Sequence, residues 1–204
     1  MYARDFRKRA WQSLRGNWSI GILASLIYIG VGVVVANVPF GALVIAGPLS
    51  VGYVSVFLAL ARRENASLGR MLEVANDFLG TFLAGLLVSL FTFLWTLLFI
   101  IPGIIKSYSY SMTYYILRDN PGMPASEAIR CSKEMMDGHK WELFCLHFSF
   151  IGWNLLSILT CGILSIFVSP YQVQADAEFY RYLNAEPDYY EQNPYTQNQY
   201  DSQM

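Results

Sequence analysis

Long apolar stretches separated by short polar ones dominate the chain. No Asp, Glu, Lys or Arg occurs in residues 16–61, 78–105 or 143–175. A helix that crosses a membrane needs about 20 mostly apolar residues. The first and third stretches are each long enough for more than one span, and the second holds one span and runs into another. The pattern predicts an all-α fold, a polytopic transmembrane helix bundle.

We expect six spans that form three hairpins, with turns near residues 37–41, 102–103 and 161–162. The fourth span is short, because 14 residues of helix rise about 21 Å, less than the roughly 30 Å hydrocarbon core. The sixth includes Gln172, Gln174, Asp176 and Glu178, and the alternative is that residues 170–183 lie along a surface. The expected spans are residues 18–38, 42–61, 78–101, 104–117, 141–160 and 163–183.

Each returning arm of a hairpin contains a proline, and we expect helix breaks at Pro48, Pro102 and Pro170. Proline lacks the backbone N–H that an interior helical position donates. The break at Pro102 should separate the third span from the fourth, because one helix over residues 78–117 would be about 60 Å long.

The distribution of basic residues predicts how the chain is threaded. Cytoplasmic loops carry the excess of Lys and Arg. With the N-terminus inside, all of the chain's 14 Lys and Arg residues except Lys106 fall in inner segments. We therefore expect a multi-pass protein of the cell membrane with the N-terminus and, if the sixth segment spans, the C-terminus in the cytoplasm.

Three inner segments, residues 3–14, 67–76 and 124–137, place their apolar side chains at helical spacing. Amphipathic helices of this kind lie in the membrane interface, or they pack against the inner end of the bundle. Because each precedes a hairpin, we interpret the chain as three copies of an interfacial helix plus a hairpin, about 60 residues each. Chance similarity among apolar helices is the alternative.

Composition narrows the function further. The chain is 54% hydrophobic and 14% charged with a net charge of -1, which predicts no nucleic-acid partner. Three cysteines without C-x-x-C spacing are interpreted as reduced packing residues. Residues 1–185 are expected to form one transmembrane domain, followed by a disordered polar tail at 186–204 that is rich in Asn, Gln, Tyr and Pro.

Polar residues at matching depth form the candidate site. His147 and Asp176 each lie about 10 Å from the inner surface if their helices stand upright, and ionisable groups inside membranes usually pair. We predict a contact between them, within a candidate intramembrane polar cluster of Tyr110, Tyr114, His147 and Asp176. A packing histidine and an interfacial aspartate are the alternative.

Lys106 stands just inside an outer turn. Its side chain can extend to the membrane surface or contact a lipid headgroup phosphate.

No catalytic, cofactor or metal site is expected. Asp137, His139 and Glu142 cluster at one end of the fifth span, but zinc needs three or four ligands in tetrahedral geometry. The sequence lacks G-x-S-x-G, the P-loop, G-x-G-x-x-G and H-E-x-x-H. These absences argue against the common hydrolases and nucleotide-dependent enzymes.

Several segments resemble a known family: IPGIIKSYSYSMTYYILRDNP, the run from ASEAIRCSKEMMDGHKWELF to FIGW, and SPYQVQADAEFYRYL. With RGNW and AGPLSVGY, they make residues 4–183 similar to the bacterial integral membrane proteins catalogued as domain of unknown function 975. More loosely, IIPGI and the helix with Ala128 and Ser132 are similar to the membrane domain fused to some glycerophosphodiester phosphodiesterases. The resemblance implies a multi-span protein, mostly of Gram-positive bacteria, and supplies no activity.

Two functions remain open. The first is a non-enzymatic scaffold, accessory or envelope-maintenance protein, whose partners are membrane lipids and possible membrane proteins or further copies of itself. The second is a small transporter or lipid-handling protein with a polar groove between spans four, five and six. A dry, packed interior would favour the first function, and a water-accessible cavity that reaches mid-membrane would favour the second.

Overall fold

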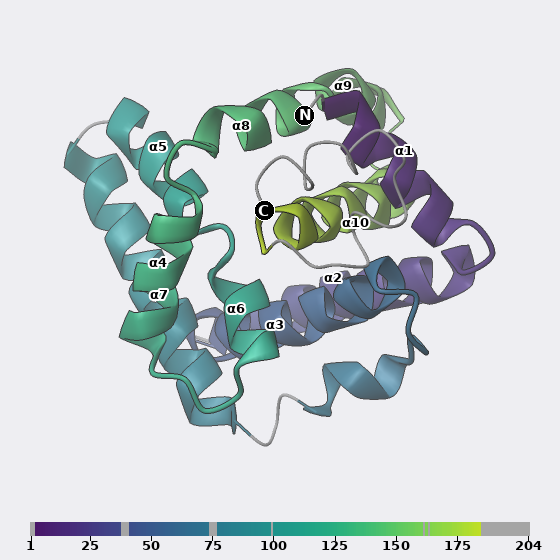
Figure 1. Cartoon of the computed structure of the whole chain (residues 1–204). Coiled ribbons are helices and arrows are strands. Elements are labelled where there is room, and N and C mark those ends of the chain that lie inside the picture. The colour runs from purple at the N-terminus through teal and green to yellow at the C-terminus, as the bar shows by residue number, and fades with distance from the viewer. Residues whose placement is uncertain are drawn as a thin grey trace, which may run out of the picture.

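The computed structural model describes residues 3–37, 41–73, 77–98, 100–160, 162 and 164–184, which are all-α (Figure 1). The predicted disordered tail lies outside these residues. The elements are α1 (Ala3–Leu14), α2 (Trp18–Ala36), α3 (Gly41–Ala61), the 3-10 helix η1 (Leu68–Met71), α4 (Phe78–Leu98), α5 (Ile100–Tyr110), α6 (Thr113–Asp119), α7 (Ala125–Met135), α8 (Lys140–Phe148), α9 (Ile151–Leu159) and α10 (Ser165–Leu183).

Four helical segments among the described residues are long and apolar enough to cross a membrane. They are Trp18–Val35, Val44–Ala61, Phe78–Leu97 and Lys140–Leu159, the last across α8 and α9. These segments indicate a multi-pass membrane protein. The structure does not show six spans, because the fourth and sixth predicted spans are not among the four segments.

The fourth and sixth predicted spans differ from lipid-facing helices for a physical reason. The fourth predicted span is interrupted between α5 and α6, at Ser111 and Met112. Helix α10 lies at the centre of the bundle and contacts α1, α2, α3, α8 and α9 (Figure 1). Its polar Gln174, Glu178 and Arg181 are buried against protein, so this helix does not need the apolar composition that lipid requires.

The prolines behave differently from the prediction. Helix α3 continues through Pro48 and α10 continues through Pro170, so the breaks expected there are wrong. Neighbouring helices pack on both arms, and such packing allows a proline within a helix. The break expected at Pro102 is also wrong: α5 runs from Ile100 to Tyr110, and Pro102 lies in its first turn, where no donor is lost.

A pair of glycines sets the closest helix crossing. A Cβ atom at Gly47 of α3 would lie only 2.1 Å from the carbonyl oxygen of Thr81 in α4, and one at Gly85 would lie 2.5 Å from the Cα of Gly47. Small residues allow helix backbones to approach closely in membrane proteins. The α3–α4 contact therefore depends on the absence of side chains at these two positions.

The amphipathic segments pack on the bundle rather than lying free at its surface. Helix α1 buries Phe6, Ala10 and Leu14, and α7 buries one face that includes Ala128 and Ile129. The middle segment forms only η1 among its described residues, and η1 contacts α3. The structure thus favours the alternative of packing against the inner end of the bundle.

Contacts between elements repeat three times around the molecule. The inner segments η1, α7 and α1 pack on the returning arms α3, α5–α6 and α10, respectively. The same three returning arms contact the outgoing arms of the next hairpin, α4, α8 and α2. The third hairpin (α8–α10) contacts α1 and α2 in the same way that the first hairpin contacts η1 and α4 and the second contacts α7 and α8. The three units, each an inner segment with its hairpin, therefore close into a ring.

A hydrogen bond from a side-chain hydroxyl to a backbone carbonyl joins each inner segment to the returning arm on which it packs. Ser55 Oγ donates to the carbonyl of Arg70 at 3.2 Å, Ser132 Oγ donates to the carbonyl of Ser109 at 2.9 Å, and the hydroxyl of Tyr171 donates to the carbonyl of Arg7 at 2.9 Å. The donor lies on the returning arm in the first and third bonds and on the inner segment in the second, so the bonds fix the packing without repeating one position.

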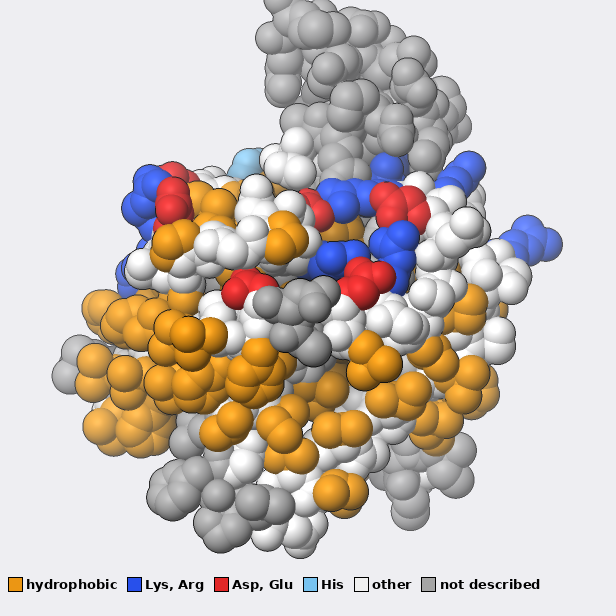
Figure 2. All heavy atoms as spheres, turned by 90° about the horizontal axis from the view of Figure 1, so that it is seen from below, with side chains coloured by type: hydrophobic (Ala, Val, Ile, Leu, Met, Phe, Trp, Pro, Cys, Tyr) orange, Lys and Arg blue, Asp and Glu red, His pale blue; other side chains and the backbone are white. Residues whose placement is uncertain are grey.

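The surface is divided into an apolar part and a charged part. Figure 2 shows hydrophobic side chains over most of one side and a band of Lys, Arg, Asp and Glu along the other. Exposed apolar side chains include Leu26 and Val34 of α2, Leu90 of α4, and Leu155 of α9. The outgoing arms therefore form the apolar outside of the ring.

Candidate functional site

His147 and Asp176 form a direct pair between two arms of the third hairpin. His147 lies in the last turn of α8, and Asp176 lies in the middle of α10. The atoms His147 Nε2 and Asp176 Oδ1 are 2.8 Å apart, so the contact predicted from the sequence is present. The side chains are 28% and 20% exposed, which leaves the pair accessible from the side of the bundle.

The helix geometry around His147 is irregular. The chain leaves regular helix at Ser149 and Phe150 and resumes it in α9. Ser149 Oγ donates to the carbonyl of Leu146 at 2.6 Å, and side-chain bonds of this type often bend helices. The pair therefore lies beside the bend between α8 and α9.

Different tyrosines surround the pair than the sequence predicted. The ring of Tyr108 lies 5.6 Å from that of His147, and the charge of Asp176 acts on both Tyr108 and Tyr115. The hydroxyl of Tyr115 also points toward α10, where it donates to the carbonyl of Val173 at 3.5 Å.

The predicted cluster members Tyr110 and Tyr114 face other elements. The ring of Tyr110 lies 6.3 Å from that of Phe91 in α4 and 5.4 Å from the ammonium of Lys133 in α7. Tyr114 interacts with Tyr28 of α2. The polar cluster therefore includes His147 and Asp176 as predicted, with Tyr108 and Tyr115 in place of Tyr110 and Tyr114.

Lys106 has an aromatic neighbour that the sequence did not suggest. Its ammonium lies 5.0 Å from the ring centroid of Trp95 in α4, within cation–π range. The headgroup contact considered for Lys106 stays a prediction.

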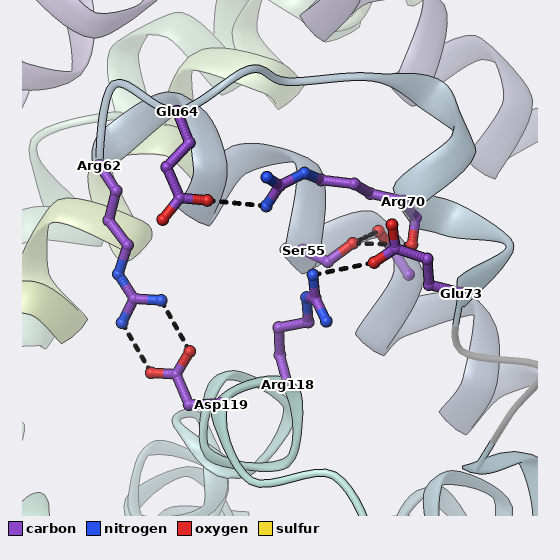
Figure 3. A network of polar contacts seen from close by, with 8 residues as sticks. Ser55, Arg62, Glu64, Arg70, Glu73, Arg118 and Asp119 are labelled. Carbon is purple, nitrogen blue, oxygen red and sulfur yellow. Dashed lines mark hydrogen bonds and ion pairs between the residues drawn. The ribbon is translucent and has the colours of Figure 1, made fainter.

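A network of charges ties the inner ends of the returning arms together (Figure 3). Arg62, at the end of α3, makes two 2.7 Å hydrogen bonds to the carboxylate of Asp119 in α6. The hydroxyl of Tyr180 in α10 donates to the same carboxylate at 2.8 Å, and Arg181 donates to the carbonyl of Ala61. Sequence reasoning placed these arginines in inner segments but missed Asp119, which accepts hydrogen bonds from both Arg62 and Tyr180.

Two further ion pairs extend this network toward η1. Figure 3 shows Arg118 directed at Glu73 and Arg70 directed at Glu64. The N–O distances are 3.1 Å and 2.9 Å. Ion pairs this exposed contribute little singly, so the bidentate Arg62–Asp119 pair is the main polar connection at this end.

The chemistry available to the His147–Asp176 pair is limited to binding and moving a proton or orienting the imidazole. The contacts described above bring no serine or cysteine nucleophile to the imidazole. No group of three or more His, Cys, Asp and Glu side chains that could hold a metal occurs among the described residues. His139 Nδ1 lies 3.0 Å from Glu142 Oε2, and Asp137 is paired with Lys140 instead.

Among the cavities that border the described residues are four that each contain charged side chains. None of these four is lined by His147 or Asp176. The largest, about 470 Å³, lies between α1 and α10.

Comparisons with known proteins add one result. No curated protein and no solved structure matches the chain. Residues 97–186 match the model of the family described as protein of unknown function (DUF975), which confirms over that part of the chain the family that its sequence resembles.

Proposed function

We propose that this protein is a non-enzymatic scaffold or accessory protein of the cell membrane that acts through helix packing. The observation that carries the proposal is the closed ring, in which the returning arms contact one another and the outgoing arms face outward. Such a molecule presents three apolar lateral surfaces, on α2, α4 and α9, to other proteins in the bilayer.

Several buried polar groups at the centre of the ring bond to other groups of the chain, which supports a structural role. The amide of Gln174, in the orientation that suits both partners, donates to the carbonyl of Phe57 and accepts from the N–H of Ala61, at 3.1 Å each. The stacked rings of Tyr115 and Tyr180 join α6 to α10 at 5.2 Å. Buried polar groups that bond to each other do not need a substrate to satisfy them.

The proposed topology has three hairpins in the membrane and both termini in the cytoplasm. It rests on the distribution of Lys and Arg and on the charged side of the molecule (Figure 2). In a background without native cysteines, an impermeant thiol reagent applied outside intact cells should label single cysteines at Asn37 or Gly162. It should not label cysteines at Asn65 or Gly122, and the reverse pattern would reject this orientation.

Photo-crosslinking in intact membranes tests the scaffold role. Photoreactive amino acids would replace Leu26, Leu90 and Leu155, one on each lateral surface, with the buried Leu58 as the matched control. We expect discrete protein adducts, or adducts with a second copy, from at least one lateral surface and none from Leu58. Adducts with lipid alone from all three surfaces would contradict the scaffold role.

A transport or lipid-handling role is the second candidate, because the His147–Asp176 pair is partly exposed. A water-filled path through the bundle would make Ala175 and Ala177, which are fully buried on α10, reachable from water. Single cysteines at these positions should stay unlabelled by impermeant reagents from either side if the core is dry. Labelling at either position would favour transport over the scaffold role.

A further inference from the structure

The largest of the four cavities differs from the others in its charge. It is lined by Arg4, Arg7, Lys8, Trp11, Gln12, Arg15 and Tyr171. Four of these seven side chains are cationic and none is acidic, whereas each of the other three cavities includes Glu64, Glu73, Asp77 or Glu178. Its volume, about 470 Å³, is that of a small-molecule site.

Arg7 leaves a donor in this region without an acceptor. Its guanidinium lies 5.2 Å from the ring centroid of Phe150, and one terminal nitrogen reaches the carbonyl of Ser149 at 3.4 Å. The Nε atom is buried and has no hydrogen-bond partner in the structure. A buried donor without a partner is costly, so this guanidinium is not fully satisfied by its contacts within the chain.

The aromatic side chains place the cavity beside the membrane surface. Trp11 is 52% exposed, and its ring contacts Trp18, the first residue of a candidate span, at 5.2 Å. It also contacts Tyr171 at 6.0 Å. Tryptophan and tyrosine favour the level of the lipid headgroups, so the four cations lie where lipid phosphates are found.

The opposite face of α1 serves a different purpose. Ser13 donates to the carboxylate of Glu178 at 2.6 Å, and Arg9 lines a small cavity with the same Glu178. Arg4, Arg7, Lys8 and Arg15 are thus separated from the buried acid of α10. Their positive charge remains available to a ligand from outside the chain.

We propose that this cavity binds the phosphate headgroup of an anionic phospholipid in the cytoplasmic leaflet. Arg7 lines the cavity and supplies a cation held in place by Phe150 and Ser149, and the exposed Arg4 and Lys8 add charge at the rim. Basic pockets on the cytoplasmic side of membrane helices commonly hold anionic headgroups. The site is independent of the scaffold role, since it requires no protein partner.

Native mass spectrometry of the purified full-length protein tests this site, with phosphatidylglycerol and phosphatidylcholine as probes. We expect the protein to retain phosphatidylglycerol selectively. The double substitution Arg4→Gln/Lys8→Gln should weaken that binding about tenfold, because each cation near the surface contributes measurably. Both side chains are exposed, so the variant should fold normally, which its thermal melt would verify.

A matched control removes the same charge elsewhere. Arg130→Gln/Lys140→Gln on α7 and α8 should retain phosphatidylglycerol as the wild type does. Equal lipid retention by the Arg4/Lys8 variant and the wild type would overturn the proposal. If inorganic phosphate alone stabilises the wild type but not this variant, and phosphatidylglycerol shows no preference, the ligand is a free phosphate and the lipid assignment is wrong.

Discussion

At the scale of single residues, the His147–Asp176 pair gives the sharpest test of the polar cluster. A carboxylate within a membrane bundle needs a donor, and His147 supplies it at 2.8 Å. Asp176→Asn keeps an oxygen acceptor for the imidazole, whereas Asp176→Leu removes it. We expect the Leu variant to lose about 1–3 kcal/mol of stability and the Asn variant to lose less.

Thermal unfolding of both variants in the same detergent measures this difference. His147→Leu combined with Asp176→Leu is the control, because it removes both partners and should recover part of the loss. Equal melting temperatures for the Asn and Leu variants would show that the hydrogen bond does not stabilise the fold.

The residue-level errors of the sequence reading have one physical cause. Counting along the chain treated residues 104–117 as one straight helix, which put Tyr110 and Tyr114 near His147. The structure interrupts this helix at Ser111 and Met112. Each residue turns a helix by about 100°, so a local interruption changes which tyrosines face α10. The His147–Asp176 contact was predictable because the pairing of an acid with a base does not depend on how residues 104–117 are rotated about their helix axis.

At the scale of helices, hydropathy located four apolar segments, including the enclosed α3, but the fourth and sixth expected spans are not among them. Helices α2 and α4 face outward, and their sequences are apolar all round. Helix α10 is surrounded by protein, and its composition follows the needs of Gln174, Glu178 and Arg181 rather than those of lipid. A sequence read one segment at a time cannot show which helices will be enclosed by others.

The α3–α4 crossing yields the prediction for this scale. Gly47→Ala would place a methyl group 2.1 Å from the carbonyl oxygen of Thr81, which belongs to backbone and cannot rotate away. Overpacking of this kind costs about 1–3 kcal/mol or more. Gly30→Ala in α2 is the matched control, because nothing lies within 4 Å of its added methyl group.

Thermal melts of the two alanine variants should therefore diverge, with Gly30→Ala at or slightly above the wild type, since alanine favours helix. If Gly47→Ala melts with the wild type, the close approach of α3 and α4 is not required for stability.

At the scale of the whole molecule, the ring shows why the repeat was only weakly visible in the sequence. The shared features are a few positions: an inner arginine on each returning arm, and the glycines before Trp18 and Trp141, where Gly16 and Gly138 adopt φ of 95° and 80°. Elsewhere each unit has its own side chains, because α2 and α4 face outward while α10 is enclosed by helices that include α1, α2, α3 and α6. The threefold order is therefore clearer in the contacts than in the residues.

A closed ring makes a final prediction about chain order. Units one and three meet through α1 and α10, where the ring of Phe6 lies 5.1 Å from Phe179 and 5.6 Å from Tyr182. A short flexible linker could thus join residue 184 to residue 3, with new termini opened at Asn65, between α3 and η1. We expect this circular permutant to insert and melt close to the wild type, because every contact between units is kept and the new termini stay on the inner side.

A permutant opened at Asn37, in a proposed outer turn, is the matched control and should insert poorly, since its N-terminus would have to cross the membrane. Failure of the Asn65 permutant under conditions where the wild type folds would mean that the α1–α10 contact depends on chain order and that the three units do not form an interchangeable ring.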